Sequence, residues 1–431
     1  MSIIKSSGAG DPASTGFYSH TIDQSLRCNG SNEYLTRTPS SSGNRRTWTY
    51  SAWVKLGVDG VRFTPIEAYS NGTNFDMFNI HTDGRILFYT VTSGTDYGGL
   101  TTQKLRDPSA WYHIVFRFDS TQSTAADRIR IYINGTQQET TNPFTTDYGT
   151  LPQNYDSFIN HTVPNHIMKN TNSSQYGQGY IAEVHHIDGT SYGPETFAER
   201  IDGIWVPKAV SGVSYGTNGF HLDFADSSDI GNNANTTDGT NDWTPSGLAA
   251  TDVVPDSPTG NNFGVMNPLD KNSMTLSEGN LKVVPSGDYK AIRGTFGIPT
   301  SGKWYFEARI LTPGGGNVQD NQIGVATQEN VLTGSSPYPQ AFTYGVGYIG
   351  SGQINRGGSA AQTSLTAFTA GKVLGVAVNV DDDEVQFYLD GSAVGTTHAL
   401  VSTTEPNFAF YVGATRAKEH LHIVRPKDEN K

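Results

Sequence analysis

The stretch RIRIYINGT at residues 128–136 has a counterpart in EVQFYLDGS at residues 384–392. In both copies apolar side chains occupy alternate positions: Ile129, Ile131 and Ile133 in the first, and Val385, Phe387 and Leu389 in the second. A period of two is typical of a half-buried antiparallel strand. Each copy therefore predicts a strand with one face in a core.

Both copies run into a turn signal. Asn134-Gly135 and Asp390-Gly391 supply the positive φ angles of a tight type I′ hairpin. A second alternating stretch lies just upstream of each copy, WYHIVFRFD at 111–119 and KVLGVAVNVD at 372–381. The unit of strand, turn, strand and tight turn thus occurs once in each half, which predicts two separate β domains.

The composition suits many short strands joined by turns. Of the 431 residues, 48 are Gly, 21 Tyr and 20 Phe, and charged residues make up 16% where about 25% is usual. Only PETFAERIDGIWVP at 194–207 suggests a helical turn or two. We expect an all-β fold.

Charge and hydropathy exclude some partners. The net charge is −12 and no basic cluster is larger than NRR at 44–46, so no nucleic-acid partner is expected. No apolar run approaches the roughly 18 residues of a membrane span, so no membrane insertion is expected. The first 15 residues lack the apolar core of a secretory signal, and Cys28 is the only cysteine, which predicts synthesis in a cytoplasm. We expect Cys28 to be a small buried residue.

Five segments follow from the distribution of strands and polar stretches. We expect an N-terminal arm at 1–20, a first sandwich at 21–225, a linker or draped loop at 226–265, a second sandwich at 266–418 and a charged tail at 419–431. The segment 226–265 is rich in Gly, Asn, Asp and Pro, which is typical of a linker or a long loop. Trp243 and Leu248 could pin it to a domain surface.

Each half resembles a known β-sandwich family. The pieces TWTYSAWVKLG, WYHIVFRFD, RIRIYINGT and GYIAEVHHIDG, in this order, make the first half similar to concanavalin-like jelly rolls of the laminin-G type. The pieces GKWYFEARI, IGVAT, YGVGYIG and GVAVNVDDDEVQFYLDG make the second half resemble a SPRY domain. The resemblance implies two jelly-roll sandwiches, whose shared architecture explains the repeated hairpin.

The whole chain also resembles virion structural proteins of tailed bacteriophages. The pieces that carry this likeness are GFYSHTIDQSLRCNGSNEYLTRTPSS, GTNGFHLDFAD and NDWTPSGLAATDVVPDSPTGNNFGVMNP. The resemblance implies a tail-fibre-type or minor structural protein on the virion, made in the host cytoplasm. It also implies other virion proteins as partners and a homo-oligomer, for which we expect a trimer.

Concanavalin-like folds include glycoside hydrolases, which need two carboxylates about 5–9.5 Å apart. The nearest pair is Glu183 and Asp188 in EVHHID. Five positions apart, they fall on opposite faces of a regular strand. Asp223 and Asp226, three apart, do not share a strand face either. We predict no catalytic residues and no enzyme activity.

Two groups invite a metal site. His185, His186 and His221 could form a cluster, but adjacent histidines on a strand point in opposite directions, so ordinary surface or core roles are expected. The run DDDE at 381–384 could bind Ca²⁺, but a solvated hairpin tip is favoured. No cofactor and no metal ligands are predicted.

The remaining candidates for binding are loop aromatics in the second half. Tyr338, Tyr344, Tyr348 and Arg356 lie in a region that often contributes to the binding face of SPRY domains. Tyr and Arg are favoured anchors in interfaces. The alternative for Tyr344 and Tyr348 is that they flank buried Gly-rich strands.

Three functions remain open at this point. Adhesion to a host surface polysaccharide or receptor is favoured. The alternatives are a capsid or tail decoration protein and, with least support, a polysaccharide hydrolase.

Overall fold

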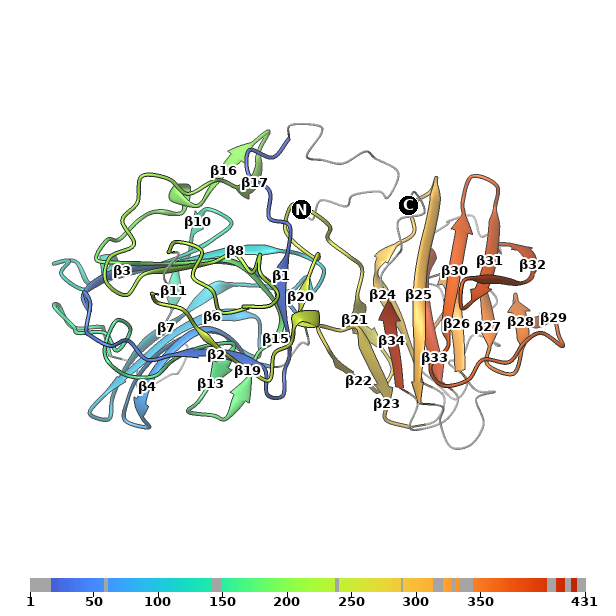
Figure 1. The fold of residues 1–431 in the computed structure, drawn as a ribbon, viewed down its shortest axis with the longest axis horizontal. Helices are drawn as coiled ribbons and strands as arrows, with labels where there is room; N and C mark the ends of the chain where they lie inside the picture. Colours follow the sequence, from blue (N-terminus) through green and yellow to red (C-terminus); the bar gives the residue numbers. More distant parts are fainter. Residues whose placement is uncertain are drawn as a thin grey trace. The chain divides into compact units, whose positions relative to one another are not determined.

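The computed structural model divides into two compact units, one ending at Asn262 and one beginning at Phe263 (Figure 1). The structure describes residues 17–57, 61–141, 149–236, 240–287, 290–312, 321–327, 330–332, 344–400, 408–414 and 420–424. Each unit is an all-β sandwich, as the sequence predicts. The helices among the described residues are three short 3₁₀ turns: Ala125–Asp127, Pro194–Thr196 and Ala250–Asp252.

One sheet of the first unit, here called sheet A, contains both stretches that matter below. Its strands, in spatial order, are β10 (Thr136–Gln137), β9 (Ile129–Ile133), β8 (Tyr112–Asp119), β3 (Thr47–Leu56), β15 (Gln178–Asp188), β1 (Ser25–Asn29) and β20 (Val253–Val254), with β18 (Phe220–Leu222) also paired to β15. All of these pairs are antiparallel. β1 pairs with the first part of β15 and β18 with its second part.

The facing sheet, sheet B, completes the sandwich. Its order is β11 (Thr140–Thr141), β7 (Thr95–Lys104), β6 (Arg85–Thr92), β5 (Asn74–Ile80), β4 (Phe63–Asn71), β12 (Asn165–Ile167), β2 (Tyr34–Arg37) and β19 (Thr244–Ser246). Two small hairpins are separate from both sheets: β13 (Lys169–Asn170) with β14 (Gln175–Tyr176), and β16 (Ala198–Ile201) with β17 (Ile204–Pro207).

Aromatic rings from both sheets meet in the core of this unit. Trp48 stacks on Phe118 with ring centroids 4.9 Å apart, and Phe78 of sheet B stacks on Phe116 of sheet A at 4.1 Å. Ile131 is fully buried among them, and so is Cys28, as predicted. Burial of this apolar area is the main stabilising term of the fold.

The repeated hairpin is confirmed in both units. β8 pairs with β9, and Ile133 pairs with Thr136 across Asn134 and Gly135, whose φ angles are 48° and 75°. In the second unit Leu389 pairs with Ser392 across Asp390 (φ 48°) and Gly391 (φ 80°). Positive φ at both central residues is the geometry of a type I′ turn.

The segment 226–262 belongs to the first unit. Ile230 and Trp243 are buried in its core, β19 pairs with β2, and β20 pairs with β1. Of the two alternatives for the polar stretch, these contacts fit the draped loop. Trp243 does pin the segment to this domain, as expected, but in the core and not at the surface, whereas the two short strands were not predicted because the segment has few apolar residues.

The helical turns suggested at 194–207 are confined to the first residues of that stretch. Only Pro194–Thr196 forms a 3₁₀ turn, and β16 and β17 then form a hairpin. Asp202 (φ 50°) and Gly203 (φ 80°) make the same two-residue turn as the repeated hairpins. This Asp-Gly signal decides the local structure, because a type I′ turn aligns its two flanking segments as paired strands.

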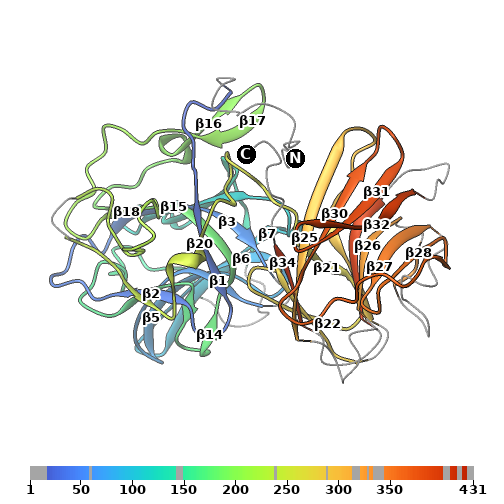
Figure 2. The same cartoon turned by 45° about the vertical axis from the view of Figure 1, so that its right-hand side comes forward.

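The second unit is also built from two facing sheets (Figure 2). The first is β21 (Met266–Lys271), β24 (Lys290–Gly297), β33 (Phe408–Ala414), β26 (Asn321–Thr327), β27 (Gly345–Ile349), β28 (Gln353–Arg356) and β29 (Ser359–Gln362). The second is β22 (Met274–Ser277), β23 (Lys282–Pro285), β34 (His420–Val424), β25 (Lys303–Thr312), β30 (Val373–Asn379), β31 (Glu384–Leu389) and β32 (Ser392–Ala399). Tyr348 of one sheet meets Phe387 of the other, with ring centroids 5.6 Å apart.

The tail predicted at 419–431 begins too early. β34 at His420–Val424 pairs on one side with β25 and on the other with β23, so it is an internal strand. Residues 425–431 lie outside the described residues. In the described part of the chain, no helix has the length and apolar character needed to cross a membrane.

Candidate functional site

A β-bulge in β15 creates a cluster of polar side chains in the first unit. Ala182 pairs with Trp53 and His185 with Ser51, so β15 has one residue more than β3 at this point. The irregularity includes Glu183, whose φ of 47° lies in the left-handed region. Bulges re-aim side chains, and non-glycine residues with positive φ are concentrated at functional sites.

The bulge determines which histidine lies on which face. His186 points into the core, where its ring contacts Trp48 and Phe220. His185 lies on the opposite face, where its ring contacts Phe197. His221 of β18 is paired with His185 in the antiparallel register, so it lies on the same face.

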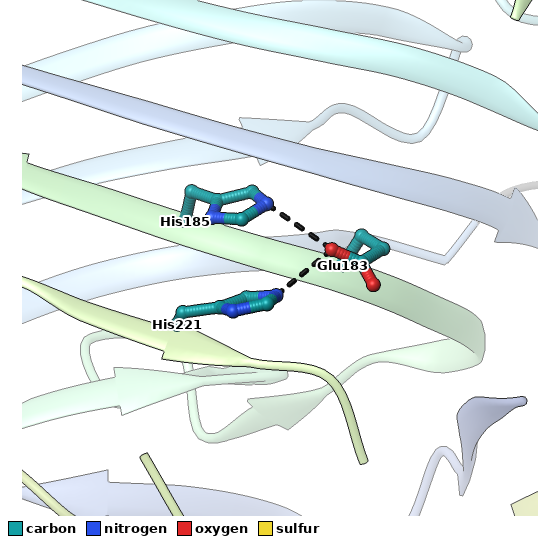
Figure 3. A group of neighbouring side chains, drawn as sticks. All are labelled: Glu183, His185 and His221. Atoms are coloured by element: carbon teal, nitrogen blue, oxygen red, sulfur yellow. Dashed lines mark hydrogen bonds and ion pairs between the residues drawn. The ribbon is translucent and has the colours of Figure 1, made fainter. Parts of the chain in front are cut away.

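Glu183 lies beside the two histidines of this face and contacts both of them (Figure 3). Its Oε2 atom is 3.1 Å from Nε2 of His185 and 2.8 Å from Nε2 of His221. The two rings are stacked, with centroids 4.1 Å apart. The other carboxylate oxygen of Glu183, Oε1, lies 3.6 Å from Nε2 of His20.

A fifth side chain and an apolar cover complete the site. The Tyr215 hydroxyl lies 2.8 Å from Nδ1 of His185. Trp53, Phe197 and Pro207 border the hollow above the carboxylate, which has no room for a water molecule. The carboxylate of Glu183 is thus largely buried, whereas His20 and His221 stay partly exposed.

Burial and hydrogen bonds shift the pKa values of the groups in this cluster. Burial by itself raises the pKa of Glu183, but hydrogen bonds from His185, His20 and His221 hold that pKa well below its usual range. Burial lowers the pKa of His185 to about 4. The hydrogen bond to Glu183 raises the pKa of His20. At neutral pH the centre thus contains an ionised carboxylate beside a neutral imidazole of His185.

Three of these residues, Glu183, His185 and His221, could together bind a metal ion. One oxygen of Glu183 and one nitrogen each of His185 and His221 lie within 4.8 Å of one another. Neutral imidazole and carboxylate are ligands of divalent transition metals. The sequence correctly predicted that His185 and His186 point to opposite faces of the strand. It did not predict that Glu183 contacts His185 and His221. The spacing Glu-x-His in EVHHID, with a histidine on a neighbouring strand, was the available signal.

The carboxylate pair that a hydrolase would need is not assembled from Glu183 and Asp188. Glu183 is engaged by histidines, whereas Asp188 accepts hydrogen bonds from the backbone N–H of Asn44 (2.7 Å) and of Asn218 (2.9 Å). Both carboxylates thus have structural partners in different places. This agrees with the expectation that the two residues do not face each other.

The structure places the candidate binding residues of the second unit in different surroundings. Tyr338 lies outside the described residues. Tyr348 is fully buried and donates its hydroxyl proton to the Thr366 carbonyl at 2.5 Å, so its prediction as a ligand contact is wrong. The alternation of Gly345–Ile349 puts this side chain on the core face of β27.

Tyr344 and Arg356 lie at the same end of the β27–β28 hairpin, since Arg356 pairs with Val346. Tyr344 is half-buried. Arg356 is exposed, but its Nε donates to the Ala399 carbonyl at 2.5 Å and it also reaches the Leu400 carbonyl. The guanidinium therefore ties β28 to the end of β32.

The acidic run 381–384 connects β30 and β31, and Asp381, Asp382 and Asp383 are exposed. Asp381 accepts a hydrogen bond from the Gly302 N–H, and Asp382 accepts one from the Asn379 side chain. The prediction of a solvated hairpin tip is confirmed. The carboxylates of Asp381 and Asp382 accept hydrogen bonds that stabilise the turn.

Comparison with known families agrees with this architecture. Residues 29–190 match the model of the concanavalin A-like lectin/glucanases superfamily, and residues 303–428 match the SPRY domain model. The first unit is a concanavalin A-like domain and the second is a SPRY domain. The histidine–glutamate centre lies in the concanavalin A-like domain, and Tyr344 and Arg356 lie in the SPRY domain.

Solved structures similar to the chain include further SPRY domains. The SPRY domain of human HERC1 is 16% identical, with 38% of this chain and 98% of that chain covered and a TM-score of 0.33. The TRIM65 PSpry domain is 13% identical, with coverages of 38% and 92% and a TM-score of 0.30. Stonustoxin is 17% identical, with coverages of 37% and 27% and a TM-score of 0.29. No curated protein matches the chain.

Proposed function

We propose that this chain is a non-enzymatic binding protein of a tailed-phage virion, of the tail-fibre type, that attaches to a host surface polysaccharide or receptor. The observation that carries the proposal is the succession of a concanavalin A-like domain and a SPRY domain in one chain. The first family includes lectins by its description. Two such modules in series suit recognition through surface loops, because loops on a rigid scaffold commonly contribute the binding residues.

The engagement of Glu183 and Asp188 supports binding over hydrolysis. Glycoside hydrolysis needs one carboxylic acid to donate a proton and a second carboxylate to act as base or nucleophile across the same bond. Glu183 holds two imidazoles and Asp188 holds two backbone amides, so neither is free for that work.

Recognition by such a protein rests on shape, aromatic contacts and hydrogen bonds from polar loops. Single sites of this kind are weak, and several copies on one particle raise the avidity without any new contact. We propose a homo-oligomer on the virion, with neighbouring virion proteins as its other partners.

The test compares one copy with many copies. Purified full-length chain is added to host cells as free protein and as protein coupled to beads, and the bound fraction is measured. We expect weak attachment of the free chain and strong attachment of the beads, which soluble host polysaccharide should inhibit. Absence of attachment from both forms would contradict the adhesion proposal.

Two further measurements separate the alternatives. A reducing-sugar assay on the same polysaccharide should show no release of new chain ends, and release would favour the hydrolase. Immunogold electron microscopy should place the chain at the tail. A uniform label over the capsid would favour the decoration protein.

A further inference from the structure

The segment before β1 is fastened to the outer face of sheet A close to Glu183. Ser19 donates its hydroxyl proton to a carboxylate oxygen of Glu199 in β16 at 2.5 Å. Ile22 is buried with Trp53 and Ala182. His20, between these two contacts, is thereby held over the carboxylate of Glu183.

The three histidine nitrogens lie from the Glu183 carboxylate at distances close to those between neighbouring ligands in a tetrahedral metal site. With metal–ligand bonds of about 2.0–2.1 Å, neighbouring ligands of a four-coordinate zinc ion lie about 3.3 Å apart. In this structure the nitrogens of His185, His221 and His20 lie 3.1, 2.8 and 3.6 Å from the oxygens of Glu183. His185 and His221 approach one oxygen of Glu183 and His20 approaches the other, so the carboxylate or the His20 ring must rotate to place all four ligand atoms around one ion.

We propose that His20, Glu183, His185 and His221 bind a zinc ion that fastens the N-terminal segment to sheet A. Three imidazole nitrogens and one carboxylate oxygen form a ligand set that suits Zn²⁺, whereas Ca²⁺ and Mg²⁺ prefer oxygen. The ligands come from three separate parts of the chain: the segment before β1, the bulge of β15, and β18.

The surroundings indicate a structural ion. Structural zinc sites use four protein ligands, whereas catalytic sites keep one position open for water or substrate. His20 lies at Glu183 as a fourth protein ligand and would fill the position that a catalytic site keeps open. With zinc on Nε2, the neutral ring of His185 would carry its proton on Nδ1, and the Tyr215 hydroxyl 2.8 Å away could accept it.

The bulge at Glu183 determines which face of β15 carries the proposed ligands. A regular β15 would turn Glu183 and His185 toward the core face and His186 toward the outside. The bulge at Glu183 reverses this, and the positive φ of a glutamate is retained there. The bulge thereby places both side chains on the outer face, where His20 and His221 also contact Glu183.

The experiment uses the full chain without an affinity tag, stripped with a chelator and dialysed against zinc-free buffer. Titration with ZnCl₂ in a calorimeter should give one site per chain with a micromolar or lower Kd. Titration with CoCl₂ should give the strong visible absorption of a tetrahedral cobalt site. Failure of the wild-type chain to bind zinc at 100 µM would overturn the proposal and leave the cluster as a hydrogen-bonded network.

Variants assign the ligands. Glu183→Gln and His221→Asn should each weaken zinc binding by about 100-fold or more, His20→Asn by about 10-fold, and Tyr215→Phe by roughly 10-fold through the orientation of His185. His161→Asn, a half-buried histidine of the same domain that hydrogen-bonds Ser42, is the matched control and should bind like wild type. Undiminished stoichiometric binding in both Glu183→Gln and His221→Asn would place the ion elsewhere.

Stability gives a second measurement that does not depend on spectroscopy. Zinc at 100 times its Kd should raise the melting temperature of the first domain by about 5 °C or more, because it binds only the folded chain. The His20 side chain is partly exposed, so His20→Asn should fold normally, and at the same zinc concentration it should lose about half of this rise. An equal rise in wild type and in His20→Asn would refute the role of the N-terminal segment.

Discussion

At the scale of single residues, Lys55 shows how the first domain tolerates a charge inside it. Its ammonium group is fully buried and lies 3.0 Å from a carboxylate oxygen of Asp256, whose side chain is 3% exposed. The indole N–H of Trp111 donates to the other oxygen at 3.0 Å. A buried charge persists only when a counter-charge and hydrogen bonds compensate its lost hydration.

We predict that Asp256→Asn destabilises the first domain by about 3–5 kcal/mol, because it leaves the ammonium of Lys55 buried without its counter-charge. Asp156→Asn is the matched control. This substitution breaks a surface ion pair in which the side chains of Arg46 and Asp156 are 46% and 49% exposed. It should lower the free energy of unfolding by at most about 1 kcal/mol. Urea unfolding followed by tryptophan fluorescence measures both, and equal losses would contradict the argument.

His113 is a second buried group whose charge state is determined by its partners. The indole N–H of Trp205 can only donate, so Nδ1 of His113 accepts at 3.0 Å. Its Nε2–H then donates to the hydroxyl of Ser51 at 2.8 Å. Burial lowers the pKa of His113 to about 3. Protonation would break the bond to Trp205, so the folded state keeps this ring neutral.

This predicts a loss of stability in acid. The unfolded chain takes up a proton on His113 below a pKa of about 6.5, whereas the folded chain does so only near 3. The contribution is therefore complete above pH 6.5 and falls as the pH drops from 6.5 toward 3, by about 1–3 kcal/mol at pH 4.5. His113→Gln can keep both hydrogen bonds without titrating. Its unfolding free energy should fall less steeply between pH 7 and pH 4.5, and an unchanged slope would contradict this assignment.

At the scale of elements, the same two-residue turn meets different surroundings. Gly135 and Gly203 both have positive φ, at 75° and 80°. A Cβ atom on Gly135 would lie 2.7 Å from the ring of Trp205, whereas one on Gly203 would meet nothing within 4 Å. The turn between β9 and β10 is thus covered by the β16–β17 hairpin, and the turn of that hairpin is open.

We predict that Gly203→Ala costs about 1 kcal/mol, because alanine at positive φ is strained. Gly135→Ala should cost roughly 1–3 kcal/mol more, since Trp205 must also move. The midpoints of thermal unfolding of the two variants measure the difference directly. Equal midpoints would show that the hairpin shifts without resistance and does not pack on the turn.

At the scale of the whole molecule, the boundary between the domains falls at Asn262 and Phe263. The segment beyond residue 225 contributes Trp243 to the core of the first domain and Asp256 to Lys55. Ser25 also donates to the Asp256 carbonyl, and Ser257 donates to the Ile22 carbonyl at 2.5 Å. The end of the first domain is therefore bound to its beginning.

We predict that the fragments 17–262 and 263–431 each unfold in one cooperative transition, because each contains a complete pair of sheets. The fragment 17–225 should lack a cooperative transition, since it loses β19, β20, Trp243 and the partner of Lys55. Differential scanning calorimetry tests all three. A cooperative unfolding transition of the fragment 17–225 would contradict this prediction and would indicate that the polar segment is a linker.

The local code of this sequence determined its elements. Alternation placed Ile131 and Ile133 in one core and Val385 and Phe387 in the other, because a pleated strand has a period of two. The Asn-Gly and Asp-Gly pairs located the tight turns through their positive φ angles. The two families were recognisable because strands and turns of this kind recur in a constant order.

Tertiary structure alone decided where side chains from distant segments meet. The extra residue at Glu183 reverses the faces of β15, and a bulge leaves no clear mark on the alternating pattern. His20, His221 and Tyr215 converge on that strand through pairing and packing across the chain. Tyr348 and Trp243 were ambiguous for the same reason: a tyrosine or tryptophan in a Gly-rich stretch suits a surface loop or a core, and only the facing sheet decides between them.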